Sequence, residues 1–116
     1  ALSTLGRRVL VVFQPHRYSR TQLLFEDFGS AFGAADRLFL TEIYPAGQAP
    51  IEGVSSELIR AAVEKHEGKA PAIIRRFEEI APSLAAEAKP GDIVLTLGAG
   101  DITKAGPLIL AALERK

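Results

Sequence analysis

The sequence predicts a single α/β domain of three layers, a Rossmann-like fold in which a mostly parallel β-sheet has helices on both faces. Three observations support this prediction. Short apolar runs rich in β-branched residues alternate along the chain with segments whose apolar residues recur at helical spacing. The apolar runs end abruptly in loops that contain Gly or Pro. A chain of 116 residues is long enough for one hydrophobic core and too short for two domains.

The first strand is expected over residues 9–13, an apolar run typical of a central strand that is buried on both faces. Pro15 ends it, because proline has no N–H for a β-ladder. Ser19 and Gln22 fit a capping box, which predicts a helix that begins at Arg20. The stripe of this helix that should face the sheet comprises Leu24, Phe28, Ala31 and Phe32.

Basic side chains are expected to cluster at the end of this strand. His16, Arg17 and Arg20 lie where the free N–H groups and the positive end of the helix dipole should also lie. Two guanidinium groups suit a phosphate or a carboxylate, because each can donate paired hydrogen bonds. The alternative is that these arginines are solvated or pair with acids elsewhere in the fold. For three basic side chains at one helix start, we favour an anion site.

A second strand is expected over residues 37–41, followed by an irregular loop over residues 42–50. Tyr44 in this loop could stack on a base or cover the edge of the core, and the sequence favours neither. Ser55 is a good N-cap for the next helix, which Gly68 ends. The remaining expected elements are a strand around Ile73 and Ile74, a helix over 78–88 in which Pro82 is tolerable only in a first turn or at a kink, a turn over 89–92, a buried strand over 93–97, and a helix through Leu113 capped by Asp101.

The loops over residues 14–21, 42–50 and 98–101 each follow a strand, so they should open on one edge of the sheet, where α/β proteins bind ligands. Gly98-Ala99-Gly100 is not a complete dinucleotide fingerprint, and Gly68-Lys69-Ala70 lacks the rest of a P-loop. The two histidines, 50 positions apart, make no metal site. The residues therefore indicate an anion-recognising domain that completes an active site shared with another domain.

Composition narrows the possible partners. The 14 basic and 14 acidic side chains cancel, so bulk charge favours neither nucleic acid nor an anionic membrane. The absence of cysteine excludes disulfides and thiolate chemistry and fits a cytoplasmic setting. No apolar run approaches the roughly 20 residues that span a bilayer. The chain has no Met, and residues 1–6 read like the end of a helix, so we expect a piece of a longer protein.

Three motifs occur in order along the chain. They are Phe13-Gln14-Pro15-His16-Arg17-Tyr18-Ser19-Arg20-Thr21, then Tyr44-Pro45-Ala46-Gly47, then Gly91-Asp92 followed by Gly98-Ala99-Gly100-Asp101-Ile102. Together they resemble the C-terminal domain of the Mur ligase family, in the branch that joins L-alanine to UDP-N-acetylmuramate. The resemblance covers nearly the whole chain, and the first motif is specific, because ligases that add later amino acids differ there.

The resemblance implies a cytoplasmic bacterial ligase of peptidoglycan biosynthesis with three domains, of which residues 1–116 would be the third. The first domain would bind the UDP-sugar. ATP and Mg²⁺ would be bound mainly by the central domain. The muramic carboxylate would be activated as an acyl phosphate, which the amine of L-alanine would attack. The partners implied are therefore UDP-N-acetylmuramate, L-alanine, ATP and the other two domains. The isolated chain is expected to fold without catalysing the reaction.

The same resemblance assigns roles to residues. His16, Arg17 and Arg20 would be catalytic and would hold the alanine carboxylate or the transferring phosphate. The substrate-binding residues would be Gln14, His16, Arg17, Arg20, Thr21, Tyr44, Ala46, Gly47, Gly98, Ala99 and Gly100. One position departs from the family, which usually has Glu where this chain has Gln48, so any role that needs a charge there is in question.

Two rival hypotheses are a stand-alone flavodoxin-like or receiver-like binding module and a purely structural or interaction domain. A receiver needs an acidic cluster at its strand ends, whereas the first strand here ends in Gln14-Pro15-His16-Arg17. In a structural domain, the arginines would be surface charges, and replacing them would change little.

Overall fold

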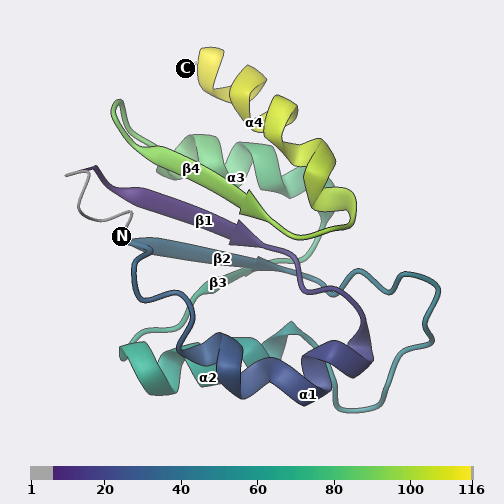
Figure 1. The fold of residues 1–116 in the computed structure, drawn as a ribbon. Coiled ribbons are helices and arrows are strands. Elements are labelled where there is room, and N and C mark those ends of the chain that lie inside the picture. The colour runs from purple at the N-terminus through teal and green to yellow at the C-terminus, as the bar shows by residue number, and fades with distance from the viewer. Residues whose placement is uncertain (1–6, 116) are drawn as a thin grey trace.

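A computed structural model describes residues 7–115 and confirms the predicted α/β class. The expectation about residues 1–6 lies outside this range. The sheet has four strands, all parallel, in the order β3-β2-β1-β4 (Figure 1). The strands are β1 (Val9–Phe13), β2 (Arg37–Thr41), β3 (Ala72–Ile74) and β4 (Ile93–Leu97). The α-helices are α1 (Tyr18–Gly29), α2 (Ser56–Glu67), α3 (Ile80–Glu87) and α4 (Ala105–Glu114).

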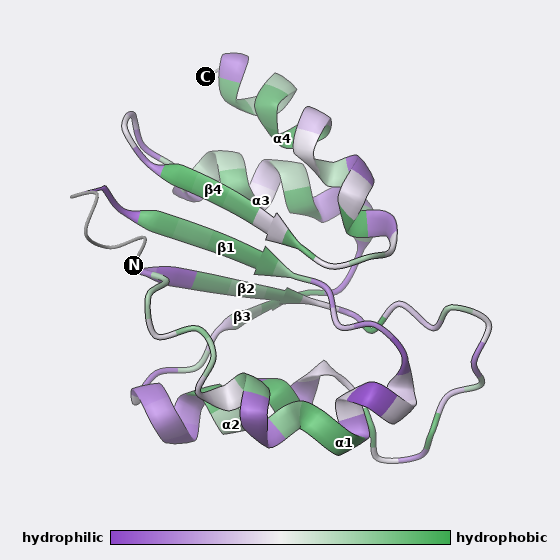
Figure 2. Ribbon diagram, viewed as in Figure 1, coloured by the Kyte–Doolittle hydropathy of each residue, from purple (hydrophilic) through white to green (hydrophobic). Residues whose placement is uncertain are grey.

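The central strand β1 carries both halves of the core, because successive side chains of a strand point to opposite faces. Val9 and Val11 pack with Ile59 in the cluster beneath α1 and α2. Leu10 and Val12 belong to the cluster on the other face, which includes residues of α3 and α4. Helices therefore cover both faces of the sheet, as predicted, and the strands form its hydrophobic middle (Figures 1 and 2).

The strand over residues 93–97 is confirmed, but its expected burial is wrong. β4 pairs with β1 on one side and lies at the edge of the sheet. Its residues are half-buried, and Leu97 is 41% exposed. An apolar run of this length reads the same in a central strand and in an edge strand, so periodicity could not reveal the order of the strands.

Helix α1 begins two residues earlier than predicted. Tyr18 is its first residue and Arg17 is the N-cap. The Arg17 side chain makes no capping hydrogen bond to the helix. The predicted capping box is therefore wrong. The helix ends at Gly29, so two members of its expected stripe, Ala31 and Phe32, lie beyond it. Phe28 and Phe32 still pack on the Phe13 ring, with centroids 5.0 and 5.2 Å away.

The other helices mostly follow their predicted caps. The Ser55 hydroxyl accepts a hydrogen bond from the Glu57 N–H at the start of α2, and Gly68 ends that helix with φ of 80°. Helix α3 follows a 3₁₀ turn over Phe77–Glu79 and has Pro82 in its first turn, where proline is tolerated. Asp101 does not cap α4 and instead begins a 3₁₀ turn over Asp101–Lys104. No helix within residues 7–115 is long and apolar enough to cross a membrane.

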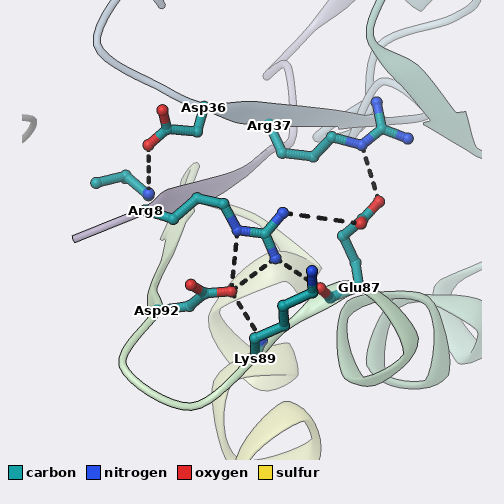
Figure 3. A network of polar contacts seen from close by, with 7 residues as sticks. Arg8, Asp36, Arg37, Glu87, Lys89 and Asp92 are labelled. Carbon is teal, nitrogen blue, oxygen red and sulfur yellow. Dashed lines mark hydrogen bonds and ion pairs between the residues drawn. The ribbon is translucent and has the colours of Figure 1, made fainter.

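A network of paired charges lies at the amino ends of the strands (Figure 3). The Arg8 guanidinium donates to the Asp92 carboxylate at 2.7 Å and to the Glu87 carbonyl at 2.7 Å. Arg37 donates to the Glu87 carboxylate at 2.9 Å. The hydrogen bond from Arg8 lowers the pKa of Asp92, and the one from Arg37 lowers the pKa of Glu87. This network ties β1 and β2 to the end of α3 and the start of β4.

Candidate functional site

Two loops lie against each other at the carboxyl edge of the sheet (Figure 1). His16 forms an isolated parallel bridge with Tyr44. The Tyr44 N–H donates to the Pro15 carbonyl at 2.8 Å, and the Arg17 N–H donates to the Tyr44 carbonyl at 2.8 Å. The pairing of β1 with β2 thus resumes beyond the sheet and fixes the backbone on both sides of His16.

The Tyr44 ring packs within the protein. It stacks on the His16 ring, with centroids 5.7 Å apart and planes inclined by 12°. Gly100 lies so close that a Cβ there would be 2.3 Å from Cγ of Tyr44. Of the two roles that the sequence left open, the structure shows Tyr44 packed against its own chain.

The glycines after β4 serve the same packing. A Cβ on Gly98, whose φ is 142°, would be 2.9 Å from the Gln14 carbonyl oxygen. Gln14 is buried, and its side-chain Oε1 accepts a hydrogen bond from the Ile102 N–H at 3.1 Å. Open α/β sheets usually bind ligands where the strand order reverses, which here is between β1 and β4. Gln14 links the segments that follow these two strands.

Arg17 has a strained backbone. Its φ of 70° and ψ of 143° lie in a region that residues with a Cβ rarely adopt. Such a conformation costs about 1–3 kcal/mol and persists only where the surroundings enforce it. Here the Arg17 carbonyl accepts hydrogen bonds from the Thr21 N–H at 3.2 Å and the Thr21 hydroxyl at 3.0 Å. Thr21 is fully buried, so it holds Arg17 from within the protein.

The predicted basic residues come together around an open depression of about 630 Å³. It is lined by His16, Arg17, Ser19, Arg20, Leu23 and Leu24. Leu23 is 80% exposed, and sequence reasoning did not single it out. Arg17 and Arg20 are exposed, and neither side chain has a hydrogen-bond or ion-pair partner among residues 7–115. The structure therefore places the three predicted basic residues around one depression, and their role in binding stays a prediction.

Within the described part of the chain, no acidic side chain lines this depression, and two acids of neighbouring segments are engaged by other arginines. The Glu42 carboxylate accepts from Arg75 at 3.0 Å, and the Glu57 carboxylate accepts from Arg60 at 2.6 Å and from Arg75 at 2.7 Å. The bond from Arg60, then that from Arg75, lowers the pKa of Glu57, which stays charged. Arg17 therefore faces the depression without a competing carboxylate, and an incoming anion would meet free guanidinium groups.

The start of α1 is less open than predicted. The Ser19 N–H donates to Oε1 of Gln48 at 2.9 Å, so one of the expected free donors is taken. Within residues 7–115, the N–H groups of Tyr18 and Arg20 have no partner. Donors of both kinds, backbone N–H groups at a helix start and guanidinium groups, suit a phosphate or carboxylate group.

The other predicted residues shape the surrounding loop. Ala46 and Gly47 have positive φ values of 52° and 84°, and the Gln48 N–H donates to the Pro45 carbonyl at 3.0 Å, which makes a tight turn. Gly98 and Ala99 are exposed in the loop that follows β4. No group of three or more His, Cys, Asp or Glu side chains in the described range could hold a metal ion.

Comparisons with known proteins agree with one another. The chain matches the family described as Mur ligase, glutamate ligase domain, over residues 1–100. It is 46% identical over 110 residues to the UDP-N-acetylmuramate--L-alanine ligase of Koribacter versatilis, covering 95% of this chain and 24% of that protein. It is 52% identical over 107 residues to the protein of the same name from Pelotomaculum thermopropionicum, covering 92% of this chain and 23% of that protein. The chain thus spans about a quarter of the length of these relatives.

A solved structure supports the fold. The crystal structure of the UDP-N-acetylmuramate-alanine ligase MurC from Thermotoga maritima has a TM-score of 0.63 to this chain at 23% sequence identity. The likeness covers 94% of this chain and 21% of that one.

Proposed function

Since the chain belongs to the Mur ligase family through its glutamate ligase domain, we propose that it is the C-terminal domain of an ATP-dependent ligase joining L-alanine to UDP-N-acetylmuramate. Relatives of that name are 46% and 52% identical over nearly all of this chain. The reaction serves peptidoglycan biosynthesis in the cytoplasm. The UDP-sugar domain and the central domain belong to the same polypeptide. ATP and Mg²⁺ are bound mainly by the central domain.

The observation that carries the proposed site is the strained, unpaired Arg17 beside Arg20 at the start of α1. Strain of this kind clusters at functional sites, because folding alone gives no reason to keep it. An arginine with no ion-pair partner in the described range, at a position that disfavours any residue but glycine, supports a role in binding.

In the proposed mechanism, ATP supplies the phosphate that activates the muramic carboxylate, and the amine of L-alanine displaces it. Arg17 and Arg20 bind the alanine carboxylate or the transferring phosphate through their guanidinium groups. Held in place before the reaction, they orient the amine and stabilise negative charge in the transition state. His16 lines the same depression, while Tyr44 and Gly100 fix the His16 ring and the loop behind it.

The test is phosphate release by the full-length ligase that contains this chain, supplied with UDP-N-acetylmuramate, ATP and L-alanine. We expect release that depends on L-alanine and falls by about 10²–10³-fold in Arg20→Ala, the usual effect of losing a group that stabilises transition-state charge. Arg76→Ala is the matched control, because Arg76 is exposed and pairs only with Glu78 among the described residues.

Three outcomes would count against parts of the proposal. Dependence on a different amino acid would keep the ligase reaction and change its substrate. Absence of release would favour the flavodoxin-like binding module. Turnover by residues 1–116 alone would contradict the requirement for the other domains.

A further inference from the structure

The first turn of α1 is held by a side chain from a distant loop. Oε1 of Gln48 accepts the Ser19 N–H at 2.9 Å, and Nε2 of Gln48 donates to the Ser19 hydroxyl at 2.9 Å. Both bonds cross 29 positions of sequence. Gln48 therefore does the work of an N-cap, which normally comes from the residue at the helix start.

The start of α1 needs this help because it lacks a cap of its own. Its N-cap is Arg17, whose side chain offers no acceptor and makes no capping bond. The backbone there is also strained, and the local bonds from Thr21 reach only the Arg17 carbonyl, which leaves the Ser19 N–H without a local acceptor. An outside acceptor for the Ser19 N–H offsets both weaknesses.

The loop that carries Gln48 is itself anchored at both ends of the turn. Tyr44 exchanges backbone hydrogen bonds with Pro15 and Arg17, each 2.8 Å long. Four residues later, the Gln48 side chain reaches Ser19. Arg17 thus binds this loop through its own N–H, and Ser19 binds the same loop two residues later. Arg20 directly follows Ser19.

We propose that Gln48 is a positioning residue, which fixes the first turn of α1 so that Arg17 and Arg20 meet their anion in one geometry. This inference rests on the proposed function. Gln48 acts through Ser19 and touches no substrate. Its chemistry also explains the departure noted in the sequence, because a glutamate carboxylate can accept from both the N–H and the hydroxyl of Ser19. The role needs an acceptor on a side chain of this length and does not need a charge.

The first test uses residues 1–116 and measures only whether Gln48 holds Ser19 through their two hydrogen bonds. Amide hydrogen exchange followed by NMR should show the Ser19 N–H protected in the wild type and in Gln48→Glu. In Gln48→Ala, its exchange should accelerate by about 10-fold or more, while amides of β1 keep their protection. Equal exchange rates of the Ser19 N–H in all three proteins would show that Gln48 does not hold this N–H.

The second test uses the full-length ligase and separates positioning from folding. Gln48→Ala should lower kcat/KM by roughly 10-fold, because small misplacements of binding groups reduce rates strongly. Gln48→Glu should restore it to within about 3-fold of the wild type, a rescue that a merely structural loop residue would not show.

The outcomes distinguish this inference from the proposed function. A wild-type protein with no ligase activity would refute the proposed function. The exchange experiment would still show whether Gln48 holds the Ser19 N–H. An active wild type whose Gln48→Ala variant loses Ser19 protection but keeps full kcat/KM would refute the positioning role.

Discussion

Two pairs of arginines, one at each end of the sheet, differ in whether their charge is paired. At the amino ends of the strands, Arg8 and Arg37 are each bound to carboxylates, and their bonds link segments far apart in the chain (Figure 3). At the carboxyl ends, the side chains of Arg17 and Arg20 have no partner among residues 7–115. Arg8 and Arg37 therefore link parts of the fold, whereas Arg17 and Arg20 stay unpaired within that range although Arg75 at the same end is paired with Glu42 and Glu57. We interpret the first pair as charges kept for stability and the second as charges kept for binding.

The sharpest way to probe this contrast is to relieve the strain at Arg17. Arg17→Gly and Arg17→Ala should both reduce activity of the full-length ligase by about 10²–10³-fold, because both remove the guanidinium. Glycine adopts positive φ freely, so Arg17→Gly should be about 1 kcal/mol more stable than Arg17→Ala in denaturant unfolding. Equal stability of the two variants would show that the backbone at Arg17 is not strained.

The next largest effect should come from the packing that supports the carboxyl end. Gly100→Ala places a Cβ 2.3 Å from Cγ of Tyr44 and 2.8 Å from Oε1 of Gln14, so one of them must move. We expect a loss of about 1–3 kcal/mol in the free energy of unfolding, the usual cost of overpacking. The control is Gly106→Ala in α4, where an added Cβ would have nothing within 4 Å, so the change should alter the free energy of unfolding by no more than about 0.5 kcal/mol. A neutral Gly100→Ala would contradict the packing of the Tyr44 ring.

The smallest effect should come from the amino end. Arg8→Ala removes the hydrogen bond that lowers the pKa of Asp92, so the midpoint of thermal unfolding at pH 7 should fall, with activity per folded molecule unchanged. A carboxylate with a lowered pKa stabilises the fold above its unfolded pKa, near 4, and that stability is lost as the pH falls through the folded value. The difference between wild type and Arg8→Ala should therefore be full above about pH 5 and shrink toward pH 2.

The control for this variant is Arg76→Ala, since Arg76 and Glu78 form an exposed pair within one turn. It should leave the unfolding midpoint nearly unchanged across the same pH range. A gap between wild type and Arg8→Ala that widened in acid would contradict the assignment to Asp92.

Local pattern was sufficient for much of the fold. The strands, the Ser55 cap and the three loops on one edge follow from apolar runs and breakers that act over a few residues. The cluster of His16, Arg17 and Arg20 could be predicted because all three lie in one loop and helix start.

The features that the sequence did not predict correctly depend on contacts between distant segments. The start of α1 was misplaced because its cap comes from Gln48, so the local Ser19 pattern gave a false answer. The burial of β4 depends on the order of the strands. The counterparts of Arg8 could not be found either, because Asp92 lies 84 positions along the chain. The tight fit of Gly100 against Tyr44 is visible only once both loops are placed.

The all-parallel sheet has a consequence for how the protein is made. As the chain leaves the ribosome, β1 can pair with β2, and β2 can then pair with β3, while α1 and α2 cover one face. Its other edge waits for β4, and contacts over such a separation form slowly because a long loop must close first. Until α4 has also been made, α3 is the only α-helix within residues 7–115 that can cover the face with Leu10 and Val12. That face is the surface a chaperone would meet on the nascent chain.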